Sequence, residues 1–289
     1  MTKKEFEEDK KLSIAGKQEY YGGNKVKTDN SFHKVWEVLL PFLIYYIVYN
    51  ILYILMAALL NVMRNQIEEG GDYLMQHAAT VTGLVNELCM IGAVLPLWRM
   101  GRLELGNCTI PVLGGKQKWV WCAVLALGAS LGLNSLFAIS GFATHSATYQ
   151  DVAQNQYGVT YGIGLILYGI ISPLVEEVVF RGIIYNRMRR FYPVTGAILM
   201  SGVLFGAYHG NLVQGVYGTC MGILLAYVYE RTGHFFIPVG FHVIANVAVY
   251  TISHVPAWQD WMLQVWSCVL LLVLAGVSLF AIERGKEAR

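Results

Sequence analysis

The sequence predicts an all-α protein, a polytopic bundle of membrane-spanning helices. Hydrophobic residues make up 55% of the 289 and charged residues only 14%, against about 25% charged residues in an average soluble domain. Apolar stretches of about 18 residues or more recur, and each is long enough to cross a bilayer core of about 30 Å. A transmembrane β-barrel would instead show short segments of alternating hydrophobicity. We therefore expect an integral, multi-pass protein surrounded by the lipid bilayer.

Eight apolar segments follow one another along the chain, and Lys and Arg are distributed unevenly around them. Basic residues gather before the first segment and in every second loop after it, whereas the opposite loops carry only Arg64 in the first and none in 141–158 or 254–260. Basic loops mark the cytoplasmic side. We therefore expect eight transmembrane helices with the N and C termini both cytoplasmic. The short bundle and the absence of eukaryotic targeting signals favour a bacterial cell membrane. The predicted spans are 35–63, 79–98, 119–140, 159–186, 193–209, 212–230, 235–253 and 261–282.

The chain before the first span differs in composition from the rest. Residues 1–34 are polar, of mixed charge, and lack apolar periodicity. Such a segment cannot bury enough apolar surface to fold alone, so we expect a flexible cytoplasmic arm, followed by one functional domain, 35–289. The net charge of +2 gives no reason to expect a nucleic-acid partner.

Two adjacent carboxylates, Glu176 and Glu177, lie inside the fourth apolar segment. A charged side chain within a bilayer costs between about 2.5 and about 17 kcal/mol, depending on how the cost is evaluated, so such residues pair with something, face a water-filled cavity or take part in chemistry. Arg181 is four residues after Glu177 and can pair with it on one helix face. Glu176 is rotated by about 100°, and we expect it to face a cavity as a general base.

Two further polar clusters follow in the fifth and seventh segments. His209 closes the run Phe205-Gly206-Ala207-Tyr208-His209, and His242 and Asn246 are four residues apart on one helix face. A His–Asn pair offers hydrogen-bond donors to a developing oxyanion, and a Glu–His pair can hold and deprotonate water. These are the groups needed to hydrolyse an amide without a covalent intermediate.

The depths of these residues in the membrane agree only in part. At about 1.5 Å per residue, Glu176 lies about 16 Å from the basic loop after the fourth segment and His242 about 12 Å into the seventh. His209 lies about 25 Å into the fifth segment on the same scale, which is deeper than a shared site requires.

Other readings of these residues remain open. Two His and one Glu could hold a divalent metal ion, although their positions on three helices neither require nor forbid one. Glu177 and Arg181 alone could be a structural ion pair, and the carboxylates could form a proton relay in a transporter, for which no inverted repeat is visible. Glu87 could lie in the wall of the cavity.

At these residues the sequence resembles the CPBP family, which contains the CAAX prenyl endopeptidases and bacterial bacteriocin-processing and immunity-type proteins. The family pattern is E-E-x-x-x-R, then F-x-x-x-H, then H-x-x-x-N. Here it reads Glu176 to Arg181, then Phe205 to His209, then His242 to Asn246, all in order. The stretch that carries the motifs covers about 159–250; the flanking spans match only in hydropathy and number.

The resemblance implies an eight-helix intramembrane endopeptidase whose site is reached from the cytoplasmic side. It implies that Glu176 and His209 activate water, that His242 and Asn246 stabilise the oxyanion, and that Glu177 and Arg181 orient the site. We favour a glutamate-dependent mechanism without a cofactor over a divalent metal bound by Glu and His. The expected substrates are small peptides, bacteriocin precursors among them, or membrane-associated proteins; the alternative is a non-catalytic scaffold, regulator or bacteriocin self-immunity protein.

Overall fold

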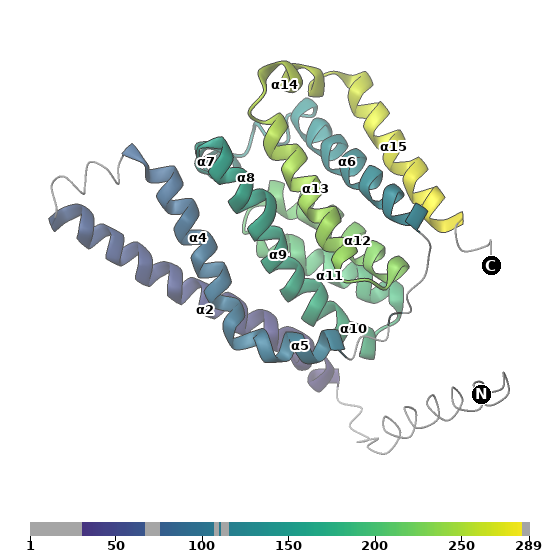
Figure 1. Ribbon diagram of the computed structural model, residues 1–289, viewed down its shortest axis with the longest axis horizontal. Coiled ribbons are helices and arrows are strands. Elements are labelled where there is room, and N and C mark those ends of the chain that lie inside the picture. Colours follow the sequence, from purple (N-terminus) through teal and green to yellow (C-terminus); the bar gives the residue numbers. More distant parts are fainter. Residues whose placement is uncertain (1–30, 67–75, 107–109, 111–115, 285–289) are drawn as a thin grey trace. The chain divides into compact units, whose positions relative to one another are not determined.

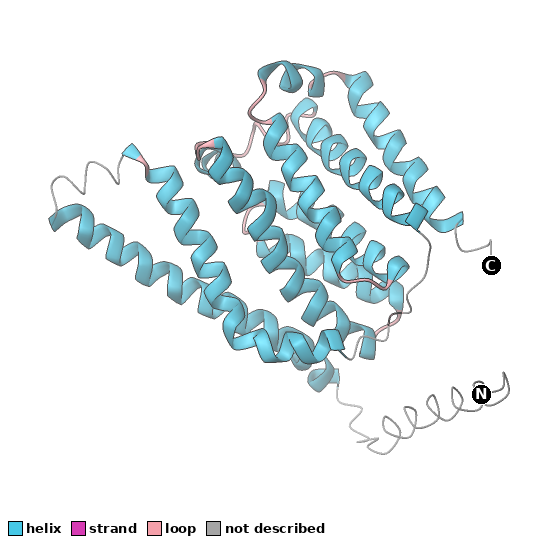
Figure 2. Ribbon diagram, in the orientation of Figure 1, coloured by secondary structure: helices cyan, strands magenta, loops and turns pink. Residues whose placement is uncertain are grey.

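The computed structural model describes residues 31–66, 76–106, 110 and 116–284, and within these ranges the chain forms helices and no strand (Figure 2). The bundle belongs to the second of two compact units, residues 37–289. Most of the predicted flexible arm lies outside the described residues and stays a prediction. The predicted all-helical fold is confirmed.

A helix occupies each of the eight predicted segments, and in the described part of the chain three additional helices, α5 (Trp98–Gly106), α7 (Ala147–Tyr157) and α14 (Pro256–Met262), lie between them. The fourth segment is one long helix that changes its winding along its length (Figure 1). The helices that match the predicted segments are α2 (Ser31–Gln66), α4 (Ala78–Val94), α6 (Lys116–Ile139), the run from α8 to α10 (Tyr161–Phe191), α11 (Val194–Tyr208), α12 (Leu212–Thr232), α13 (Phe236–Ile252) and α15 (Val265–Arg284).

Six of these segments are long and apolar enough to cross a bilayer, the second of them as Ala78–Gly106, in which α4 continues through a short 3₁₀ turn into α5. α13 qualifies only together with α14 (Pro256–Met262), to which it is joined by a bend of 109°. α11 has 15 residues and rises only about 22 Å, less than the hydrocarbon core. Eight crossings, and the cytoplasmic position of both termini, therefore stay predictions.

The short helix α11 packs closely against α12 through facing glycines. A Cβ built on Gly222 would lie 3.0 Å from the Cα of Gly202, and one on Gly218 would lie 3.2 Å from the Cα of Gly206. Backbones approach this closely only where side chains are absent, which is the packing that small-xxx-small pairs allow in lipid. The two helices thus form a hairpin, and Gly210 in its turn has a φ of +72°.

The predicted loop 141–158 is wrong in one respect, because it contains the helix α7 (Ala147–Tyr157). Ser146 caps its N-terminus, where the side-chain oxygen accepts a hydrogen bond from the Tyr149 amide at 3.3 Å. Only a few apolar residues are present in α7, so hydropathy did not indicate it. Together with α14 it lies at the end of the bundle opposite the basic loops (Figure 1).

Replacing Gly206 by Ala should destabilise the protein, because the new methyl group would meet the Thr219 amide nitrogen at 2.8 Å. Overpacking of this kind costs about 1–3 kcal/mol. Gly240 is the matched control: it also lies in a helix, but a Cβ there has no neighbour within 4 Å, so Gly240→Ala should be neutral or stabilising. Thermal unfolding in detergent measures both variants, and equal midpoints would contradict the close contact of α11 and α12.

Candidate active site

The two adjacent carboxylates lie in a short α-helical stretch between two π-helical turns of one long helix. α8 (Tyr161–Ile166) leads through a π-helical turn, η2 (Leu167–Ile171), into α9 (Ser172–Glu177). A second π-helical segment, η3 (Val178–Tyr185), follows and passes into α10 (Asn186–Phe191). Wider π-helical turns within α-helices are frequent at functional sites.

The Glu177 carboxylate is completely buried and holds two partners with one oxygen. Its Oε1 accepts a hydrogen bond from Nη1 of Arg181 at 2.8 Å and lies 2.9 Å from Nδ1 of His242. Arg181 is also fully buried; its Nη2 donates to the Gly222 carbonyl at 2.9 Å, and its guanidinium lies 4.8 Å from the ring centre of Phe205. One buried group of charges therefore links the long helix to α12 and α13.

His242 stands between the two glutamates. Its Nδ1 contacts Glu177, and its Nε2 lies 3.6 Å from Oε2 of Glu176. That distance is too long for a hydrogen bond but close enough for an ion pair. Because Oε1 of Glu177 already accepts from Arg181 as a carboxylate, Nδ1 of His242 is the donor of the pair. Nε2 is then the nitrogen directed toward Glu176.

His209 lies at the C-terminal end of α11. Its Nδ1 lies 2.9 Å from the Phe205 carbonyl oxygen, and because a carbonyl only accepts, Nδ1 carries the proton and Nε2 is left as an acceptor. The Phe205 ring packs edge-on against both imidazoles, with ring centres 5.0 Å from His209 and 5.7 Å from His242.

The depth of His209 now has a simple explanation. Measured from the bend between Phe191 and Val194, Glu176 is 15 residues back along one helix and His209 is 15 residues forward along the next. Two antiparallel helices of similar rise bring these positions to the same level. Glu176 had been measured from Arg187, which lies within α10, and this had made Glu176 seem shallower than His209.

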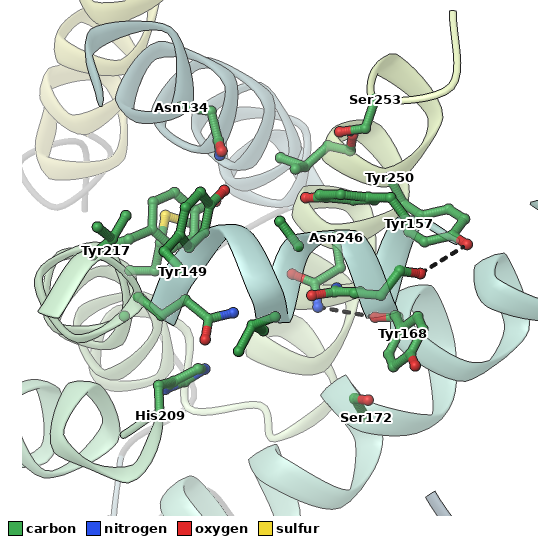
Figure 3. A pocket seen from close by; sticks show the side chains of 18 of the residues that line it. Asn134, Tyr149, Tyr157, Tyr168, Ser172, His209, Tyr217, Asn246, Tyr250 and Ser253 are labelled. Carbon is green, nitrogen blue, oxygen red and sulfur yellow. Dashed lines mark hydrogen bonds between the residues drawn. The ribbon is translucent and has the colours of Figure 1, made fainter. Parts of the chain in front are cut away.

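Asn246 lies one helical turn beyond His242 on α13. Its Nδ2 donates a hydrogen bond to the Tyr168 carbonyl at 3.0 Å (Figure 3). This carbonyl belongs to η2, where the change in winding alters the usual pattern of backbone pairing. The bond fixes the amide plane and leaves the second N–H of Asn246 available.

All these residues surround one cavity of about 870 Å³. Glu176, His209, His242 and Asn246 line it, whereas Glu177 and Arg181 lie beneath its wall. Figure 3 shows His209 and Asn246 projecting into this space from different helices, with tyrosine rings around them. The three motifs, separated by tens of residues in the sequence, therefore converge.

A second polar network, which the sequence suggested only through Glu87, borders the cavity. Glu87 is buried, and its Oε1 accepts a hydrogen bond from the Ser172 hydroxyl at 2.6 Å and one from Asn86 at 3.2 Å. The Tyr49 hydroxyl donates to Asn86 at 2.6 Å. Ser172 lies one turn before Glu176 on α9, so this network positions the helix surface that carries the glutamate facing the cavity.

Sequence reasoning missed the backbone partners and much of the cavity wall. The carbonyls of Gly222 and Tyr168 carry no signal in a sequence, because every residue has one. Tyr149 and Tyr157 reach the cavity from α7, a segment that was predicted as a loop. The spacing of Gly202/Gly206 and of Gly218/Gly222 is a sequence signal for the close approach of α11 and α12.

The residues present do not make a three-ligand metal site. Both ring nitrogens of His242 are directed toward carboxylates, and Nδ1 of His209 is engaged with a carbonyl. Of these residues, Glu176 and Nε2 of His209 are then left as possible metal ligands. Within the part of the chain that the structure describes, no three His, Cys, Asp or Glu side chains are grouped as metal ligands, and protein zinc sites use three or four.

Replacing Arg181 by Gln should destabilise the protein strongly, because it leaves the Glu177 carboxylate buried beside His242 alone. Removing one partner of a buried ion pair costs about 3–5 kcal/mol. Arg231→Gln is the matched control: Arg231 pairs with Glu283 at 2.5 Å, and both side chains are partly exposed, at 26% and 41%. Its loss should cost at most about 1 kcal/mol. Unfolding in detergent compares the two, and similar losses would contradict a central role for the buried pair.

Two comparisons with known proteins give matches to membrane peptidases. Residues 158–248 match the family model described as type II CAAX prenyl endopeptidase Rce1-like. The Bacillus subtilis (strain 168) protein named "Putative membrane peptidase YdiL" is 28% identical over 169 residues, which cover 52% of this chain and 68% of that protein. No solved structure gives a significant match.

The matched segment runs from the start of the long helix to α13, and it contains all three motifs. Outside this segment, the helical stretches Ser31–Arg64, Ala78–Gly106, Lys118–Ile139 and Val265–Arg284 are apolar and long enough to cross a membrane. The resemblance predicted from the motifs is therefore confirmed: the segment that carries them is similar to CAAX-type membrane endopeptidases, and the chain is an integral, multi-pass membrane protein.

Proposed function

We propose that this protein is an intramembrane endopeptidase that hydrolyses a peptide bond with a water molecule activated by Glu176 and His209. The observation that carries the proposal is the single cavity into which Glu176, His209, His242 and Asn246 converge from three helices. A membrane-embedded cavity lined by a carboxylate, two imidazoles and an amide has few structural uses, and it holds the groups that amide hydrolysis needs.

In this mechanism the attacking water lies between Glu176 and Nε2 of His209. Both groups accept hydrogen bonds from it, which leaves an oxygen lone pair directed at the scissile carbonyl carbon. Glu176 takes one proton from the water as the new C–O bond forms. The same proton then passes to the leaving nitrogen as the C–N bond breaks, so the products are a carboxylic acid and an amine, and Glu176 is regenerated.

The oxyanion that forms on the carbonyl oxygen needs hydrogen-bond donors at a fixed position. Asn246 supplies the second N–H of its amide, because the first is bonded to Tyr168. His242 supplies Nε2–H when its imidazole carries both protons. Nδ1–H meanwhile stays bonded to Glu177. Glu177 and Arg181 act as positioning residues.

A peptide or small membrane-associated protein is the proposed substrate. The cavity is large enough for several residues of an extended chain. Nine of the described residues that line it are tyrosines, which combine apolar area with a hydroxyl group. Processing of bacteriocin precursors stays a prediction, and so does the alternative of a non-catalytic scaffold or self-immunity protein.

Substitution of the proposed water-activating residues should abolish cleavage. Glu176→Gln and His209→Ala should each lower the rate by about 10²- to 10⁴-fold, the contribution typical of a general base. Glu283→Gln, which alters a partly exposed carboxylate on α15, should leave the rate unchanged. The measurement is cleavage of a panel of membrane-associated peptides by purified protein in detergent or liposomes. Unchanged turnover in both site variants would eliminate the mechanism, and biological function retained in a folded Glu176→Gln variant would favour the scaffold.

Chelators should leave the activity unchanged, because the mechanism assigns water activation to Glu176 and His209 and uses no metal ion. The measurement is the cleavage rate before and after dialysis against EDTA and against 1,10-phenanthroline. A control dialysis without chelator accounts for losses of protein. Activity that disappears with chelator and returns with an added divalent metal would overturn the glutamate-dependent choice while leaving the endopeptidase proposal intact.

A further inference from the structure

The cavity occupies one end of the helical bundle. On α6 its lining residues fall within 131–138, near the C-terminal end, and on α13 they fall within 242–253. On α11 they begin at Phe205, in the last turn, and on α12 they end at Met221, in the first half. In every case the lining half is the one farther from the basic loops.

The basic residues gather at the opposite end, and ion pairs hold those helix ends together. Arg187 on α10 donates to Glu104 on α5 (Trp98–Gly106) at 3.0 Å. Arg189 on α10 pairs with Glu230 on α12 at 2.9 Å. The helix ends that carry these charges lie together away from α7 and α14 (Figure 1).

Between the cavity and this basic end the bundle is filled. Directly after the motif residues, Phe180, Ile183, Ile184 and Tyr185 on η3 are completely buried. Tyr229 on α12 packs against this layer, and the Tyr185 hydroxyl donates to Glu230 at 2.8 Å. In the part of the chain that the structure describes, this close-packed layer and the partly buried ion pairs beyond it separate the cavity from the basic end.

On the other side, the short hairpin of α11 and α12 leaves space. Because α11 ends after 15 residues, the hairpin turn lies only part of the way along the long helix, and the cavity extends beyond it. Its wall there is formed by α7 and by residues beside α14, such as Tyr149, Ser253 and Gln259. The sequence between α6 and α8, and between α13 and α15, carries neither Lys nor Arg.

Because basic loops mark the cytoplasmic side, we propose that the cavity opens on the non-cytoplasmic face and takes its polypeptide substrate from that face. The inference rests on the proposed function and gives it a substrate class: a segment presented outside the cytoplasm that carries no acidic side chains near the scissile bond. Among the described residues that line the cavity there is no Lys or Arg, and Glu176 is the one carboxylate, so an acidic segment would meet no counter-charge. Access from this face is opposite to the cytoplasmic access that the family resemblance implied.

The test is labelling of a cysteine placed inside the cavity with a membrane-impermeant, charged maleimide. Val249 lines the cavity on α13, about one turn beyond Asn246, and Val249→Cys changes little volume. The full-length protein is labelled in intact cells and in inverted vesicles, and mass spectrometry of its peptides separates the new site from the native cysteines. Val249→Cys should react several-fold more in intact cells than in inverted vesicles.

Two control variants make the result decisive. Arg102→Cys, exposed on α5 at the basic end, should react only in inverted vesicles. Val269→Cys on α15 has a side chain that is 54% exposed toward lipid and should react in neither. Reaction of Val249→Cys in inverted vesicles alone, or in neither preparation, would overturn the inference. Labelling does not depend on hydrolysis, so labelling as expected in a protein that cleaves no peptide would refute the proposed function and leave the access route standing.

Discussion

The Glu177 carboxylate, buried between Arg181 and His242, is the interaction on which the rest of the site depends. Two charged side chains with no exposed surface are stable only if their geometry compensates for the loss of water. The guanidinium meets this condition by binding Glu177 and the Gly222 carbonyl together. Gly222 also packs against Gly202, so the residue whose carbonyl accepts from the guanidinium also lies at the close contact of α11 and α12.

A second constraint is the difference in length between neighbouring helices. The long helix of residues 161–191 crosses the bundle completely, whereas α11 returns along only part of it. An apolar helix that ends at mid-depth would leave its terminal backbone groups unpaired in hydrocarbon, which is unfavourable. Here the helix ends at a polar cavity, and the Phe205 carbonyl in its last turn is bonded by the His209 ring. The polar cavity therefore accommodates both the end of α11 and the His209 ring.

The sequence predicts the helical class, the eight apolar segments and the grouping of the three motifs, because in a membrane protein a charged residue within an apolar stretch is a strong signal. It does not predict which nitrogen of His242 contacts which glutamate, since that depends on rotation and tilt of whole helices. Carbonyl partners such as Tyr168 are invisible for the same reason, and the π-helical turns beside Glu176 have no residue pattern. The weakly apolar α7 was missed because hydropathy detects lipid contact and not contact with a water-filled cavity.

The adjacent positions of Glu176 and Glu177 are explained by the rotation of about 100° per residue along a helix. Glu177 is turned into the protein, where it is fully buried and bonded to two partners, whereas Glu176 is turned to the cavity and remains slightly exposed. His242 contacts both and so transmits the fixed position of one carboxylate to the surroundings of the other. An aspartate at either position would shorten the side chain by one methylene group and break this arrangement. The two glutamates also cannot exchange roles, because the rotation of the helix fixes which of them faces the cavity. The pair is therefore one unit in which a buried acid holds the histidine beside the acid that meets the water.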